Sequence, residues 1–157
     1  MIDAMLPATR ARRPSITRAG ATPQHIARAY RDADRPASAW LERLDEVERG
    51  RFRRRGRRLV ALIVGYLDAT DPAKAARWRT RARSLAAEYG ARARTLGISL
   101  SDTINGFLAF RRPFLAELAA AAPRRSLDSR EAALFVLQAA SVMDELLAAL
   151  MRGYSDT

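Results

Sequence analysis

The sequence predicts an all-α protein, a bundle of four to six helices with short loops and a flexible N-terminal arm. Three observations predict this class. From Leu59 onward, apolar side chains recur at every third or fourth position, which is the period of an amphipathic helix. No segment shows the strict alternation of apolar and polar residues that is typical of strands. Thr-Pro and Asp-Pro pairs, which place a capping residue before a proline, stand where helices are expected to begin.

The N-terminal part is expected to be basic and only partly helical. Residues 1–21 mix Pro, Arg, Ser and Thr without periodicity, which predicts a flexible basic arm. Thr22-Pro23 predicts a short helix that ends near Asp34, because a residue before a proline avoids helical angles. Residues 22–58 are interpreted as a helical basic extension of a bundle domain that covers residues 59–157.

A second helix is expected to begin at Ser38. Gly50 and Gly56 weaken it, so it either breaks near residues 51–56 or continues to about Asp68. The apolar spacing of this helix is given by Trp40, Leu41, Leu44 and Val47.

The clearest amphipathic helix is predicted from Pro72 to Leu96, with Asp71 as its cap and Gly97 closing it. Its apolar arc contains Ala75, Trp78, Ala82, Leu85, Ala86, Tyr89, Ala93 and Leu96.

Two more helices complete the expected bundle. Ser99 or Ser101 caps one that runs to about Ala122 and contains Pro113, where a kink is expected. The last helix is predicted over residues 129–153, and its apolar residues cover about half of the circumference. That surplus, together with the all-apolar stretch Leu59–Leu67, indicates either two helical neighbours or a homodimer.

Composition excludes several classes of function. The 157 residues include no cysteine and one histidine, His25, so disulfides, thiolate metal sites and a His-based triad are excluded. A metal site on inner carboxylates would need the Glu-x-x-His pattern, which is missing. No Gly-rich phosphate loop is present. We therefore expect no catalytic residue, no metal and no cofactor, and we predict that the protein is not an enzyme.

The net charge of +11 is unevenly distributed. Residues 1–97 contain 22 basic and 10 acidic residues, whereas residues 98–157 contain six and seven. Such asymmetry is typical of proteins with an acidic or polyanionic partner. No secretory signal or long apolar run is apparent, so a cytoplasmic protein without a membrane span is expected.

The strongest candidate contact surface is an arginine cluster in residues 51–58. Its candidate residues for polyanion or nucleic-acid contact are Arg51, Arg53, Arg54, Arg55, Arg57 and Arg58. Such a cluster can neutralise phosphates or meet an acidic membrane surface. It can also be an ordinary solvated helix face, partly paired as Asp45 with Arg49 and Glu48 with Arg51.

Arg111 is a second candidate, because it projects into the apolar face of its helix. A charge there must be paired or reach solvent, so we expect it to pair with Asp144 or to bind a carboxylate of a ligand or partner. Phe110, which projects off the main apolar face, is a candidate interface residue. The other aromatic residues at helical spacing are interpreted as core, with a cofactor or small-ligand pocket beside Arg111 as the alternative.

From about Leu59 to Tyr154 the chain resembles the N-terminal domain of bacterial RsbT co-antagonist (RsbRD-type) proteins. The segments that carry the resemblance are, in order, Leu59–Leu67, Asp71-Pro72, Leu85–Tyr89, Leu96–Leu100, Phe107–Leu115 and Asp144–Tyr154. The resemblance implies a helical sensory or interaction module in stress or transcription signalling, without catalytic residues.

Two functions follow as expectations. The preferred one is a homodimeric regulatory bundle that acts by contact with signalling or transcription proteins. The alternative is a DNA-binding transcriptional regulator that uses the arginine cluster of residues 51–58.

Overall fold

The structure is a computed structural model that describes residues 39–124 and 128–156, with only the backbone for residues 121–124. The predicted arm, the helix expected at residues 22–34, Ser38 and His25 lie outside the described residues. Within them the chain is all-α and contains no strand, which confirms the predicted fold class. The helices are α2 (Ala39–Glu42), α3 (Glu46–Asp68), α4 (Pro72–Thr95), α5 (Leu100–Arg124) and α6 (Ser129–Ser155).

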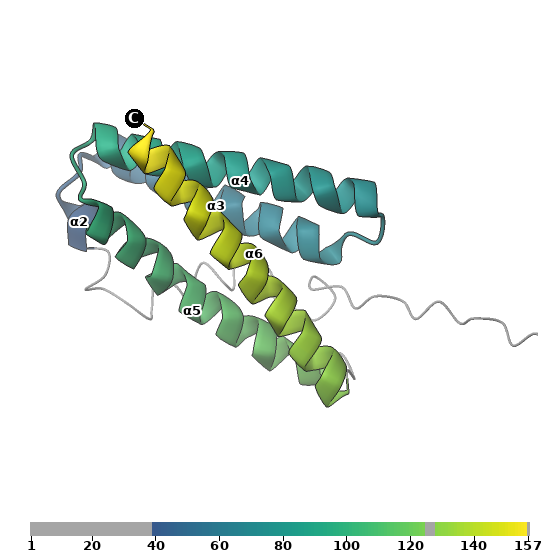
Figure 1. Cartoon of the computed structure of the whole chain (residues 1–157). Coiled ribbons are helices and arrows are strands. Elements are labelled where there is room, and N and C mark those ends of the chain that lie inside the picture. The colour runs from purple at the N-terminus through teal and green to yellow at the C-terminus, as the bar shows by residue number, and fades with distance from the viewer. Residues whose placement is uncertain (1–38, 125–127, 157) are drawn as a thin grey trace, which may run out of the picture.

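The four long helices form two antiparallel pairs, as Figure 1 shows. The α3 helix lies alongside α4, and α5 lies alongside α6. The pairs meet mainly where α6 crosses α4, and these two helices run in the same direction. Arg79 of α4 binds Glu145 of α6, and further along both helices Gly90 of α4 touches Leu150 of α6. These two contacts show that α4 and α6 run parallel where they cross.

The main core lies between the two pairs. It is built mostly from the apolar faces of α3 and α6, joined by aromatic residues of α5. Its fully buried side chains include Ile63, Phe114, Leu118, Met143, Leu146 and Leu150. Burying side chains of this size contributes about 1.5–3 kcal/mol each, so this cluster supplies most of the apolar stabilisation.

A second, smaller core closes one end of the bundle. Trp40 of α2 packs edge-on against Phe52 of α3, with the ring centroids 5.3 Å apart, and both contact the region of Ala93 and Ile98. The hydroxyl of Tyr154 in α6 donates a hydrogen bond to the carbonyl of Ile98 at 2.9 Å. The predicted extension thus contributes buried residues to the bundle, and its expected boundary after residue 58 falls inside the continuous helix α3.

Helix ends follow the predicted capping residues. Asp71 accepts hydrogen bonds from the backbone of Ala73 and Lys74, as expected for the start of α4. At the other end Gly97 has φ +71°, and the amides of Gly97 and Ile98 donate to the carbonyls of Arg94 and Ala93. This pattern is a Schellman motif, in which a glycine takes the left-handed conformation.

Of the two serines considered as the cap of α5, the structure selects Ser99. Its hydroxyl accepts a hydrogen bond from the amide of Asp102 at 3.0 Å. At the far end α5 extends to Arg124, two residues beyond the expected end at Ala122. The last helix also exceeds its predicted range and begins at a reciprocal capping box between Asp128 and Glu131.

The helix expected from Ser38 differs from the prediction. A turn at residues 43–45 separates α2 from α3, and α3 then passes through Gly50 and Gly56 without a break. The expected break near residues 51–56 is therefore wrong, and continuation to Asp68 is confirmed. Because the turn shifts the helical register, Val47, which was assigned to the apolar face, is 62% exposed.

The all-apolar stretch Leu59–Leu67 and the wide apolar half of α6 are largely buried against other helices of the same chain. In Leu59–Leu67 all the large aliphatic side chains are buried, and α6 contacts α4, α5 and α3. Two helical neighbours, the first of the two predicted explanations, therefore account for the wide apolar half of α6. These features no longer argue for a homodimer.

By length and composition, α6 is the one helix of the described residues that qualifies as a candidate membrane span, and 39% of its most apolar window is buried. Its apolar residues pack against neighbouring helices, and a buried core helix satisfies the same criterion. The expectation of a protein without a membrane span stays a prediction.

Candidate functional site

The α3 helix presents most of the predicted arginine cluster to solvent. Arg53, Arg54, Arg57 and Arg58 are exposed, and none of them forms an ion pair with another residue of the described ranges. We call these four residues the arginine face. They occupy two successive turns opposite Phe52 and Leu59, which are buried. The burial of these two apolar residues fixes which way the four guanidinium groups point.

The other two arginines of the cluster have different surroundings. Arg51 is bound to Glu48 through its Nη1 atom at 2.5 Å, which confirms the predicted i,i+3 pair. Arg55 is only partly exposed, and its Nη1 atom is buried without a hydrogen-bond partner in the described part of the chain. The structure therefore brings four of the six predicted contact residues together on one open surface.

Glu48 is a buried carboxylate that links α3 to α4. Its side chain accepts hydrogen bonds from Arg92 Nη2 at 2.5 Å and Nε at 3.2 Å, in addition to the one from Arg51. The hydrogen bonds from Arg92 lower the pKa of Glu48 below its ordinary value, with a smaller contribution from Arg51, while burial acts in the opposite direction. Glu48 therefore neutralises two arginines that border the arginine face.

The predicted pair of Asp45 with Arg49 is wrong. Asp45 instead caps α3 by accepting a hydrogen bond from the amide of Glu48 at 2.8 Å. Arg49 donates to the carbonyls of Leu41 and Glu42 at the end of the short helix α2 and to that of Leu44 in the turn that follows. Neither residue is available to neutralise the arginine face.

Two exposed cations of α4 lie on the side of that helix that meets α3. Arg81 precedes Arg92 by 11 residues, which is close to three helical turns, so both lie on the side of α4 that meets α3. Lys74 lies on the same side, two turns before Arg81. Both are exposed and, within the described part of the chain, have no acidic partner. Glu88, an exposed acid one turn before Arg92, lies on this side of α4 as well.

The predicted pairing of Arg111 with Asp144 is present. Arg111 Nη2 donates to Asp144 Oδ1 at 2.9 Å, which joins α5 to α6. The Nε atom of Arg111 is buried and has no hydrogen-bond partner among the residues that the structure describes. Phe110 is half-buried at the edge of the core, with its ring centroid 6.3 Å from that of Phe107 and 5.7 Å from that of Phe114. Only part of its ring is thus available to a partner.

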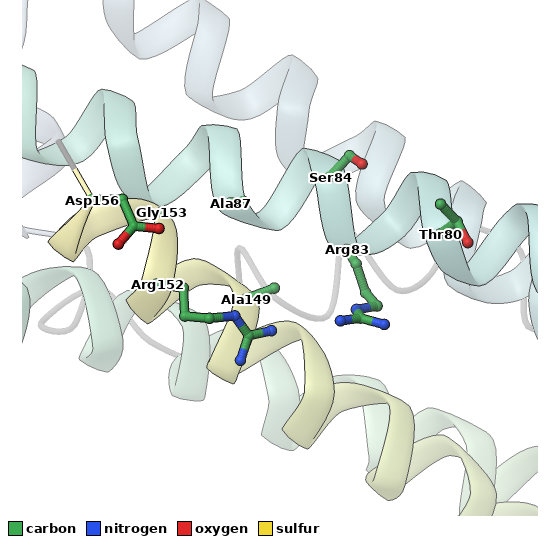
Figure 2. A pocket seen from close by; sticks show the side chains of 8 residues that line it. All are labelled: Thr80, Arg83, Ser84, Ala87, Ala149, Arg152, Gly153 and Asp156. Carbon is green, nitrogen blue, oxygen red and sulfur yellow. The ribbon is translucent and has the colours of Figure 1, made fainter.

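A groove lies elsewhere, along the crossing of α4 and α6. It has a volume of about 470 Å³, and neither Arg111 nor any aromatic residue lines it (Figure 2). In the described ranges no group of three or more acidic or histidine side chains has the arrangement of a metal site.

Comparisons with protein families, curated proteins and solved structures found no match to this chain. The resemblance to the RsbT co-antagonist domain thus remains an expectation.

Sequence reasoning missed the contacts that depend on tertiary structure. The pair Arg79–Glu145 and the hydrogen bonds from Arg92 to Glu48 join residues far apart in the chain. Helical periodicity predicted the apolar arc of this helix but carried no information on which helix meets each edge of that arc.

Proposed function

We propose that this chain is a non-enzymatic regulatory bundle that binds duplex nucleic acid through the arginine face of α3. The observation that carries the proposal is the set of four exposed arginines with no acidic partner among the described residues. Two acids near the start of α3 are already engaged, because Glu48 is bound by Arg92 and Arg51 and Asp45 caps the helix.

The dimensions of the face suit a phosphate backbone. Residues 53–58 cover about 7.5 Å of helix axis, since an α-helix rises about 1.5 Å per residue. Duplex DNA carries one negative charge per roughly 1.7 Å of its axis, so a face of this length meets several phosphates. Guanidinium groups pair with phosphate oxygens through two parallel hydrogen bonds. Contacts of this kind hold a protein on DNA without reading its sequence.

A matched pair of double variants tests the proposal. Arg54→Gln with Arg58→Gln removes two charges from the arginine face. Arg112→Gln with Arg130→Gln removes two exposed arginines of α5 and α6 that form no ion pair with any described residue. In an anisotropy titration of a short fluorescent duplex at about 50 mM salt, the first variant is expected to bind roughly tenfold more weakly than wild type. The second is expected to bind like wild type, and equal loss in both variants would exclude a role for this face.

A second candidate is regulation by protein contact, and an exposed apolar patch on α6 favours it. Leu134 and Leu137 are 58% and 64% exposed and lie one turn apart. Large exposed aliphatic side chains on one helix face are typical of contact surfaces. The expected homodimer would be held by this patch. Sedimentation of wild type and of the double variant Leu134→Ser with Leu137→Ser tests it, and a wild-type monomer at micromolar concentration would contradict the dimer.

A further inference from the structure

The groove beside the α4–α6 crossing contains two arginines that the nucleic-acid proposal does not use. From α4 it is lined by Thr80, Arg83, Ser84 and Ala87, and from α6 by Ala149, Arg152, Gly153 and Asp156. Figure 2 shows the side chains of Arg83 and Arg152 extending into the same space from the two helices. The carboxylate of Asp156 lies at the other end of the groove, next to Gly153.

Small residues create this groove. A Cβ atom on Gly153 would lie 2.1 Å from the carbonyl oxygen of Ala87, so the two backbones touch at this point. Ala87 and Ala149 contribute only methyl groups to the lining. The floor is therefore close to the backbone, and about 470 Å³ remains open between the longer side chains at its sides.

Arg83 and Arg152 differ from Arg79 of α4 in that they have no acidic partner among the described residues. Arg79, one turn before Arg83, makes a bidentate pair with Glu145 of α6, which raises the pKa of Arg79 above its ordinary value. Arg83 and Arg152 form no ion pair and no side-chain hydrogen bond with any residue of the described ranges. The groove is lined by the two positive charges of Arg83 and Arg152 and the one negative charge of Asp156, so its net positive charge favours an anion.

We propose that this groove binds the phosphate group of a small phosphate monoester. Two guanidinium groups offer several N–H donors to a dianion, and the hydroxyls of Thr80 and Ser84 add further donors at the α4 side. The volume exceeds that of a phosphate group, so an organic portion fits beside it. Asp156 would accept a hydrogen bond from a hydroxyl or amine of that portion.

Ribose 5-phosphate, inorganic phosphate and ribose are suitable probes. In titrations followed by backbone amide NMR, ribose 5-phosphate is expected to bind wild type with a Kd on the order of 1 mM or below. It should shift the amide signals of Thr80, Ser84 and Gly153. Inorganic phosphate is expected to shift the same signals at higher concentration, and ribose is expected to leave them unchanged. Equal shifts with ribose, or none with ribose 5-phosphate, would overturn the proposal.

Variants separate this groove from the arginine face. Arg83→Gln with Arg152→Gln is expected to weaken ribose 5-phosphate binding by about tenfold or more, since both charged donors are lost. Arg112→Gln with Arg130→Gln, which carries the same charge change, is expected to bind like wild type. If both variants lost binding equally, the effect would be one of net charge and the groove would not be the site.

The same variants distinguish the source of the phosphate. If the groove variant lost affinity for duplex DNA while wild type failed to bind ribose 5-phosphate, the groove would contact a nucleic-acid backbone and the small-molecule proposal would be wrong. If ribose 5-phosphate bound as expected and DNA did not bind at all, the groove proposal would stand and the proposed function would fail.

Discussion

Gly90 and Gly153 illustrate how single residues determine the crossing of α4 and α6. A Cβ atom on Gly90 would lie 2.0 Å from the carbonyl oxygen of Leu150, and one on Gly153 would meet the backbone of Ala87. Both neighbours are backbone atoms, which move only with their helices. Any side chain at either position would therefore push α6 away from α4.

We predict that Gly90→Ala destabilises the protein by about 1–3 kcal/mol, since added volume must displace a packed helix. Gly56→Ala in α3 is the matched control, because a Cβ atom there meets nothing within 4 Å. That substitution is expected to stabilise by about 0.5–1 kcal/mol through the higher helix propensity of alanine. Urea unfolding measures both changes. A Gly90→Ala variant as stable as wild type would show that the two helices do not approach this closely.

Glu48 provides a pH-dependent contribution to stability. Because its pKa is lowered in the folded state, principally by hydrogen bonds from Arg92, the unfolded chain takes up a proton first as the pH falls. The contribution is thus complete above the ordinary glutamate pKa of about 4.5 and decreases below it.

We expect Glu48→Gln to be less stable than wild type at neutral pH, with a difference that shrinks as the pH falls below that of an ordinary glutamate. Denaturant unfolding at several pH values measures this difference. Glu46→Gln, at an exposed residue of the same helix turn, serves as the control and should follow wild type closely across the range. A Glu48→Gln difference that did not depend on pH would contradict a buried, arginine-bound carboxylate.

Most of the helices could be predicted, because the residues that cap them lie close to their ends in the sequence. Asp71-Pro72 and Gly97 fixed the ends of α4 because capping depends on a few adjacent residues. The break between α2 and α3 was misplaced, because Arg49 donates to two carbonyls of α2 and to one in the turn, and so stabilises a turn that contains no glycine or proline.

Substitutions of Gly97, in the turn between α4 and α5, test the Schellman motif that ends α4. Gly97 has φ +71° and open space where a Cβ atom would lie, so replacing it would cost conformational strain without a clash. We predict that Gly97→Ala destabilises by about 1 kcal/mol and that Gly97→Asn costs less, because asparagine tolerates the left-handed region better. Chemical denaturation of the two variants measures the order, and a reversal would contradict the Schellman ending.

For the molecule as a whole, the sequence predicted the arginine cluster, but it did not predict which of the six arginines are exposed and form no ion pair with a described residue. Helical spacing predicted the pair of Arg51 with Glu48, but it could not show that Arg92 of α4 also binds Glu48 or that the Nη1 atom of Arg55 is buried. The groove with Arg83 and Arg152 could not be predicted from the sequence either, because it exists only where two helices distant in sequence cross. The predicted pair Arg111–Asp144 succeeded because a charge on an apolar face requires a partner.

The most direct test of the account is the salt dependence of DNA binding by wild type and by a variant with Arg53, Arg54, Arg57 and Arg58 all changed to Gln. If each arginine neutralises one phosphate, the slope of log K against log salt falls in magnitude by about 0.9 per residue removed, or by roughly three to four in total. Wild type would then lose about two orders of magnitude of affinity through these four contacts between about 50 and 200 mM salt. Equal slopes for wild type and variant, or no DNA binding by wild type at low salt, would contradict the proposed role of α3.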